Sequence, residues 1–189
     1  MSVVRSWVVF AAAVAVLLLG QDPGGAMEAP QPAGAVILTV AGKIAHSNRG
    51  PLDPKRDGFL NHHEVTFKRA LQFDRKMLAG LKQGTVRARP AALSAPATFA
   101  GPLLHEVLKL AGAEPASVRF LALDGFGAEL DGNILSDKRW ILAMEMDERP
   151  LALGGRGPIW LMRPSASGVE VGEEEGQRWV WALFYMEVK

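Results

Sequence analysis

The chain of 189 residues contains no cysteine. This absence excludes disulfides, zinc–thiolate sites, iron–sulfur clusters and any cysteine nucleophile. An excess of one charge is also lacking, because 21 lysines and arginines stand against 20 aspartates and glutamates. Such a balance does not predict a nucleic-acid partner. With 49% apolar and 22% charged residues, the composition is typical of a single globular domain.

Long apolar runs are scarce, and the longest lies near the N-terminus. It covers residues 7–19 and follows one basic residue, Arg5. This length is typical of the apolar part of a signal peptide, because a spanning helix needs about 20 residues. Small residues at 24–26 would permit cleavage, so we assign 1–26 to a signal peptide. The alternative is an uncleaved anchor formed by residues 3–19. Either interpretation predicts a periplasmic or otherwise exported domain that contacts a membrane only through an uncleaved segment.

Residues 21–34 are rich in proline, glycine and alanine. This composition is typical of a linker rather than a packed segment. We therefore predict a linker at 27–34, followed by one folded domain at 35–189.

The first half of that domain is predicted to mix a strand with helices. The run AVILTVAGKI predicts a buried strand that ends near Gly42. A helical stretch is predicted from about 62 to 81, with a break near 73–74. The segment GPLLHEVLKLAGA at 101–113 predicts the clearest helix, because its large apolar residues share one stripe and Gly112 stands at its C-terminal end.

Short apolar runs separated by glycine, proline and aspartate predict strands through the second half. The last run, WVWALFYMEV at 179–188, is apolar on both faces. A strand of that kind belongs in the middle of a covered sheet. The predicted class is therefore α+β, with β-rich mixed sheets and a few short helices.

The stretch DPKRDGFLNHHE at 53–64 nearly fits the EF-hand pattern for calcium. Glycine and proline just before it exclude a useful entering helix, and Lys55 places a positive charge where an oxygen ligand is needed. Asn61 and Glu64 have the spacing of a capping box, which predicts that a helix begins there. We interpret the stretch as a turn feeding a capped helix, with calcium binding as the minor alternative.

Two arginines among glycines are the candidate ligand contacts. Arg49 follows Asn48 in HSNRG, and Arg156 precedes Trp160 in LALGGRGPIW. Glycine lets backbone approach a ligand closely, and a guanidinium can hold an anion with two donors. The alternative is that both arginines tie loops together through carboxylates or carbonyl oxygens. The four histidines show no metal-ligand spacing, so we predict no metal site, and no catalytic set is identifiable.

Several segments of the second half follow one another in a distinctive order. The helix at 101–113 precedes a strand that ends in the turn 124–126, Asp-Gly-Phe. A loop at 151–158 comes next, and a strand containing tryptophan closes the domain. This order, over roughly 35–189, resembles the oxidoreductase molybdopterin-binding domain of the sulfite-oxidase type, and most closely a small, exported, single-domain branch. The resemblance implies a sulfite-oxidase-like fold able to hold a pterin cofactor.

The same resemblance implies a ligand that this chain lacks. Catalytic members hold molybdenum through a cysteine thiolate, in a stretch that corresponds to residues 85–93 here. The sequence TVRARPAAL contains no cysteine, and the nearest serine is Ser94. Molybdenum prefers the soft thiolate, so no replacement is evident. Arg156 is the residue that carries over to the family's contacts with the pterin phosphate.

We therefore expect a non-catalytic, exported module that binds a small anion or a periplasmic protein partner. The candidate contacts are Arg156, Arg49, Asn48 and Trp160. The alternative is a molybdopterin-dependent oxidoreductase that holds its cofactor without thiolate ligation. The residues by themselves assign neither an enzymatic activity nor a cofactor, and molybdopterin enters through the resemblance alone.

Overall fold

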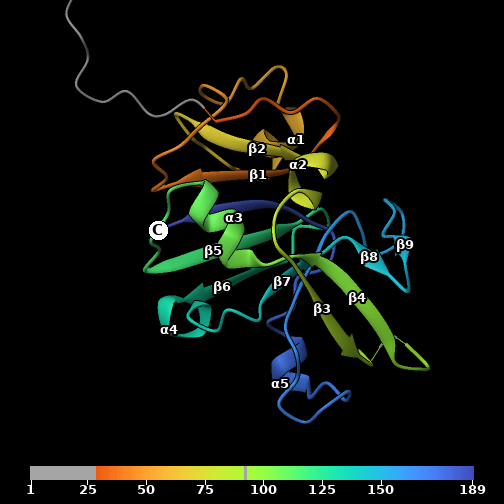
Figure 1. The fold of residues 1–189 in the computed structure, drawn as a ribbon. Helices are drawn as coiled ribbons and strands as arrows, with labels where there is room; N and C mark the ends of the chain where they lie inside the picture. The colour runs from red at the N-terminus through yellow and green to blue at the C-terminus, as the bar shows by residue number, and fades with distance from the viewer. Residues whose placement is uncertain (1–28, 92) are drawn as a thin grey trace, which may run out of the picture.

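The computed structural model describes residues 29–91 and 93–189, and Figure 1 shows their arrangement. The predicted signal peptide or anchor, within residues 1–26, lies outside them. The described part contains three β-sheets and a few short helices, which confirms the α+β class with mixed sheets. Among the helices of these residues, none is both long enough and apolar enough to cross a bilayer.

The largest sheet has five strands in the order β2-β1-β11-β5-β6. Strand β1 (Val36–Gly42) confirms the first predicted strand and its end at Gly42. Strand β11 (Leu183–Val188) lies in the middle, parallel to β1 and antiparallel to β5 (Ser117–Ala122). The edges are β2 (Ala70–Asp74) and β6 (Gly127–Asp131). The position of β11 confirms the expectation drawn from its two apolar faces, although the strand begins four residues later than predicted.

A second sheet has the order β3-β4-β8-β9, and a third pairs β10 with β7. Their bounds are β3 (Gln83–Ala88), β4 (Ala97–Pro102), β7 (Ile141–Ala143), β8 (Glu145–Met146), β9 (Arg149–Pro150) and β10 (Trp160–Met162). Strands β3 and β4 form a long hairpin that projects from the body (Figure 1). The sequence did not predict this hairpin, because its strands are rich in small and polar residues and bury only some of their side chains.

The helices of the described residues are all short. They are α1 (Gly58–His62), α2 (Arg75–Ala79), α3 (Leu104–Leu110), α4 (Gly132–Leu135) and α5 (Glu173–Gly176). Helix α3 confirms the helix predicted within 101–113 and buries Leu104, Val107 and Leu108. Gly112 follows its C-cap with φ of 62°, the left-handed conformation that glycine adopts without strain.

The long helix predicted from 62 to 81 is wrong. Residues 70–74 form β2, because Leu71 and Phe73 become fully buried when this segment pairs with β1. The predicted capping box is also wrong, since Asn61 lies inside α1 and Glu64 follows that helix with φ of 56°. Pairing and burial in the sheet outweigh the local capping signal here.

Asp74 joins three segments at the end of β2. Its carboxylate accepts from the backbone N of Met77 at 2.7 Å, which caps α2. It also accepts from the backbone N of Ala33 and of Gly34, each at 2.8 Å. The break that the sequence indicates near 73–74 is therefore the start of a helix, and the last residues of the predicted linker are tied to the domain.

Candidate ligand-binding site

A cavity of about 380 Å³ contains two of the predicted contact residues, Arg156 and Trp160. It lies between the turn before β6, the loop before β10, the segment after β3 and the segment around α5. Three of the chain's five tryptophans line it. The lining residues are Pro90, Ala91, Phe126, Arg156, Trp160, Val171, Gly172, Glu173, Gly176, Gln177, Trp179 and Trp181.

The guanidinium of Arg156 stacks on two of these indoles. Its Cζ lies 5.3 Å from the ring centroid of Trp160 and 5.5 Å from that of Trp181. Within residues 29–91 and 93–189, this guanidinium forms no ion pair or hydrogen bond with the protein, and its side chain is half-buried. Indole faces attract a cation but leave the N–H donors of a guanidinium free. Arg156 is thus a positioned cation with donors available to a ligand.

The indoles of Trp160 and Trp179 are buried and pack against each other. They are 3% and 4% exposed and meet edge to face, with ring centroids 6.3 Å apart. Trp160 also contacts the ring of Phe99 edge to face at 5.3 Å. Both indole Nε1 atoms are buried and have no hydrogen-bond partner in the described part of the chain. Buried donors without partners are costly, so they mark a place where packing has been favoured over polar satisfaction.

The glycines beside Arg156 have a local explanation. A Cβ on Gly157 would lie 2.5 Å from the backbone carbonyl of Leu151, and Gly154 has φ of 90°. The backbone therefore approaches its own chain closely here. The carbonyl of Arg156 accepts from the backbone N of Ala182 at 2.9 Å, which fixes the loop beside Trp181. Together these contacts determine where the guanidinium lies.

Asn48 and Arg49, the other predicted contacts, lie outside this cavity and bond within the fold. Asn48 Nδ2 donates to the carbonyls of Pro30 and Gln72 at 2.9 and 2.8 Å. Its Oδ1 accepts from the backbone N of Gln72 at 2.7 Å. Arg49 forms an ion pair with Asp57. The structure thus separates the two predicted segments, and Arg49 ties loops together as in the alternative interpretation.

The stretch that the resemblance relates to molybdenum reaches the cavity, and its described residues place no histidine, cysteine, aspartate or glutamate there. Of residues 85–93, Pro90 and Ala91 line the wall, and Arg89 pairs with Glu170. In the described ranges, no group of three or more histidine, cysteine, aspartate or glutamate residues is placed to hold a metal ion. A molybdenum centre anchored by a thiolate therefore does not fit these residues.

The histidines do not converge either. His46 Nδ1 lies 2.8 Å from the carbonyl oxygen of Leu110. The ring of His63 packs edge to face on Phe59, with centroids 4.7 Å apart. It follows the end of α1 and is partly buried, because β11 presents Phe184 to the same cluster.

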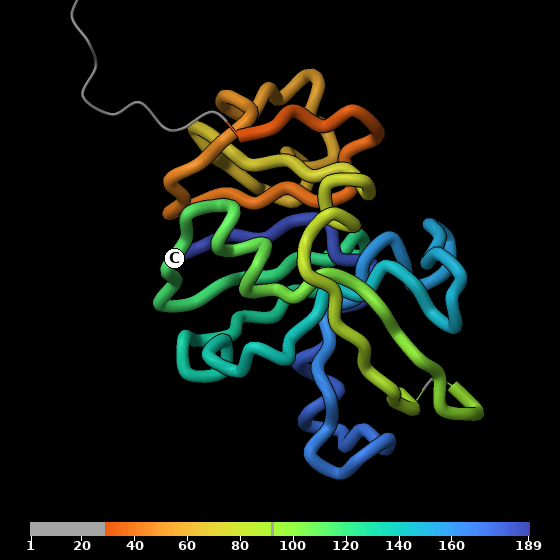
Figure 2. Tube along the Cα trace, in the orientation of Figure 1, coloured from red at the N-terminus to blue at the C-terminus, as the bar shows by residue number. Residues whose placement is uncertain are grey.

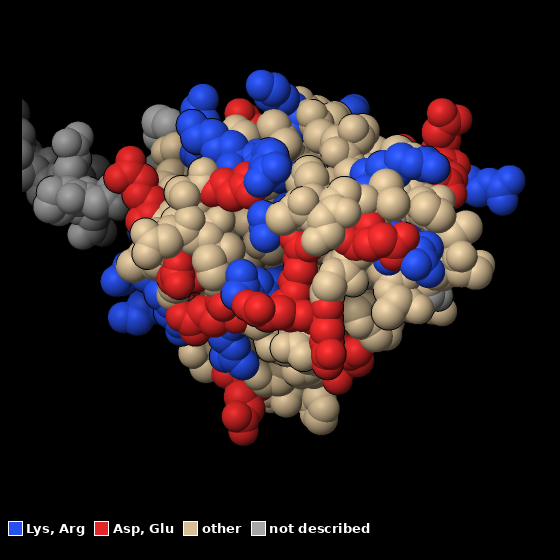
Figure 3. Space-filling model, turned by 90° about the horizontal axis from the view of Figure 1, so that it is seen from below, with Lys and Arg blue, Asp and Glu red and all other residues tan. Residues whose placement is uncertain are grey.

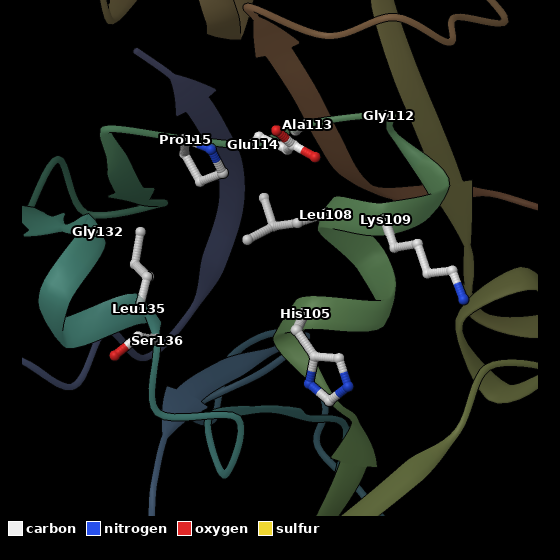
Figure 4. A pocket seen from close by; sticks show the side chains of 10 residues that line it. All are labelled: His105, Leu108, Lys109, Gly112, Ala113, Glu114, Pro115, Gly132, Leu135 and Ser136. Carbon is white, nitrogen blue, oxygen red and sulfur yellow. The ribbon is translucent and has the colours of Figure 1, made fainter.

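A second cavity, of about 630 Å³, lies between α3 and α4 (Figure 4). Leu108 and Leu135 point into it, while the side chain of Lys109 points away. His105 lies on its rim with Nε2 3.2 Å from Glu106 Oε1. Its polar groups do not meet at one point, so the smaller cavity with Arg156 is the better candidate for a ligand.

Sequence reasoning missed Trp179, Trp181 and Phe126. It treated both tryptophans as residues of the final strand, whereas 179–182 precede that strand and Ala182 has φ of 52°. Phe126 was noted only as part of a turn. The aromatic pair flanking one residue in WVW was the available signal, but strand periodicity explained it equally well.

Comparison with known proteins bears on the fold alone. No family model matches the sequence. A solved structure, the sulfane dehydrogenase SoxCD from Paracoccus pantotrophus, matches with a TM-score of 0.50 and 14% sequence identity. The match covers 80% of this chain and 37% of that chain, so this chain spans little more than a third of its length. The likeness is consistent with a molybdopterin-oxidoreductase-like fold, as the order of segments implied.

Proposed function

We propose that the chain is a binding module that holds a small, flat organic anion in the cavity beside Arg156. The observation that carries this proposal is the Arg156 guanidinium, stacked on Trp160 and Trp181 and without an acidic partner in the described residues. A cation placed on apolar surface with its donors free interacts more strongly with an anion than a solvated cation does. The aromatic walls favour a flat ring attached to that anion.

The side chains that line the cavity support a binding role rather than a catalytic one. Its polar side chains are Arg156, Glu173 and Gln177. Among the described residues, no serine, histidine or lysine lines it, so a nucleophile with an adjacent base has no counterpart there. Glu173 is exposed at the rim, where solvent screens its charge from an anion on Arg156. Export through residues 1–26 remains part of the same proposal.

The alternative role, an oxidoreductase that holds molybdopterin without a thiolate, uses the same cavity. It is favoured by the position of Pro90 and Ala91, because the wall includes the stretch that the resemblance relates to the cofactor. A pterin is itself a flat ring system with an anionic tail. If one binds, Arg156 would hold the anionic group and the indoles would pack on the ring.

Two measurements on the full chain separate these roles. Protein prepared from its native host is analysed for molybdenum, and for pterin fluorescence after denaturation. Molybdenum near one per chain would overturn the non-catalytic role. Protein free of both metal and pterin is the expected result.

Binding is then measured by tryptophan fluorescence, since three indoles line the cavity. Naphthoate, carboxypterin and sulfate serve as probes. We expect the two ring anions to bind more tightly than sulfate. Arg156→Gln should lower the affinity for both ring anions by about tenfold or more, because a charge-assisted hydrogen bond is lost. Arg119→Gln, at an exposed position on β5, is the control. Equal affinities for Arg156→Gln and wild type would overturn the proposal.

A further inference from the structure

Residues 164–178, here called the strap, form one wall of the cavity. The strap leaves the body after Arg163, which follows β10, and rejoins it at Trp179. It includes α5 and projects from the same side of the body as the β3-β4 hairpin (Figure 2). Five of its residues line the cavity, namely Val171, Gly172, Glu173, Gly176 and Gln177. Anything that enters the cavity beside these residues passes the strap.

The strap is held by few apolar contacts. Val171 is its one apolar side chain that packs against the main core, and it is only partly buried. Helix α5 buries no side chain. Ser165 is buried, but Ala166, Ser167 and Gly168 beside it are exposed. A segment with so little buried apolar surface opens at a low cost in free energy compared with global unfolding.

Polar contacts supply the attachment instead. Arg89 Nε and Nη2 donate to the two carboxylate oxygens of Glu170 at 3.0 and 2.5 Å. The backbone N of Arg89 donates to the carbonyl of Val169 at 2.6 Å. We call the Arg89–Glu170 pair the latch, because it joins the body directly beside the cavity residue Pro90 to the strap directly beside Val171.

A second ionic contact holds the far end of the strap. Arg163 Nη2 lies 3.1 Å from Glu175 Oε1, outside hydrogen-bond geometry. Arg178 pairs with Glu174 at 2.9 Å, but both residues belong to the strap, so this pair does not attach it to the body. Figure 3, which looks onto this side of the molecule, shows acidic and basic side chains side by side on the surface.

The geometry points to a lid. We propose that the strap opens and closes over the tryptophan cavity and that the latch sets how often it is open. The latch side chains are 42% and 54% exposed, so salt screens their attraction. Rising ionic strength therefore favours the open strap. What enters depends on the proposed function, but the motion itself is a property of the fold and can be measured without a ligand.

The test uses the cysteine-free chain to lock the strap. Arg89 and Glu170 are paired as a parallel β-bridge, a spacing compatible with a disulfide. In Arg89→Cys/Glu170→Cys, oxidation closes the latch covalently and reduction removes it. Acrylamide quenches the fluorescence of all five tryptophans, and the difference between variants reports access to Trp160 and Trp179, which are nearly fully buried in the closed form.

We expect Glu170→Gln to raise the quenching constant by about twofold, as for a weakly held segment that loses its main attachment. Glu174→Gln, which breaks the pair internal to the strap, should match wild type. At high salt, the oxidised double variant should be quenched less than wild type. The reduced double variant should be quenched more than wild type under the same condition. Equal quenching for Glu170→Gln and Glu174→Gln, or for the oxidised and reduced forms, would overturn the lid.

A second experiment tests whether the lid controls the rate of ligand binding. Association of naphthoate, followed by stopped-flow fluorescence, should be slowed about tenfold by oxidation of the double variant, since closure gates entry. If wild type binds no naphthoate, the proposed function fails while the quenching result still decides the lid. If naphthoate binds equally fast to the oxidised and reduced forms, the lid fails and the proposed function stands.

Discussion

Arg49 and Asp57 are joined by two hydrogen bonds, from Nη2 to Oδ2 at 2.7 Å and from Nη1 to Oδ1 at 3.1 Å. Asp57 Oδ2 also accepts from the backbone N of Asp53 at 2.8 Å. The Arg49 hydrogen bond lowers the pKa of Asp57 below its usual value of 3.8, and burial opposes it only in part. A carboxylate that an EF-hand would offer to calcium is therefore held by a cation.

Asp57→Asn should destabilise the fold at neutral pH by about 1 kcal/mol, because the arginine loses its charged partner. A lowered folded pKa means that the contribution is fully present above the unfolded value of 3.8 and is lost as pH falls through the folded value. Urea unfolding of both proteins at pH 7 and at pH 3 checks this. The difference between their midpoints should narrow at the lower pH, and a constant difference would contradict the assignment.

Calcium should not bind at residues 53–64. Arg49 occupies both oxygens of Asp57, and Lys55 and Arg56 add positive charge within the same turn. Calorimetric titration of the full chain with calcium chloride should give no saturable heat, and added chelator should leave the urea midpoint unchanged. A saturable heat that Asp53→Asn removes would show that the loop rearranges to bind the ion.

The sequence indicated those parts of the fold whose signal does not depend on a distant partner. Strand β11 was placed mid-sheet because apolar residues alternate onto both of its faces. Helix α3 was found because its apolar stripe and Gly112 are local features. The segment 62–81 was predicted wrongly because its helical pattern is also local, whereas pairing of β2 with β1 decides the structure.

In the candidate site, too, the sequence indicated the residues that are neighbours in the chain and missed those that meet only in the fold. Arg156 and Trp160 are close in sequence, and the structure keeps them together. Trp181 joins them from the end of the chain, because the carbonyl of Arg156 accepts from the backbone next to it. Arg49 was selected for its glycine neighbour, but no sequence rule indicates that Asp57 returns to it across a turn. Tertiary partners of this kind are invisible to patterns of spacing.

Gly157→Ala should disturb both the fold and the site. An added Cβ would lie 2.5 Å from backbone atoms of Leu151, so the loop must move, at a cost of about 1 to 3 kcal/mol. Gly155→Ala is the matched control, since its Cβ would meet the nearest atom at 3.4 Å and its φ is not positive. Urea unfolding gives the stability. Because Arg156 lies between these glycines, naphthoate affinity should fall for Gly157→Ala and persist for Gly155→Ala, and equal behaviour of the two variants would contradict the packing argument.

Trp181→Leu should lower the affinity for ring anions more than the affinity for inorganic anions. The substitution removes one of the two indole faces that position the Arg156 guanidinium but keeps an apolar side chain at the cavity wall. Loss of one partly desolvated cation–π contact is worth about 1 kcal/mol, or about fivefold in Kd for naphthoate. Phe126→Leu, at an exposed aromatic on the rim, serves as the control and should change Kd less. A fluorescence titration of each variant with naphthoate and with sulfate checks this. If Trp181→Leu binds naphthoate as tightly as wild type, the indole faces do not contribute to binding.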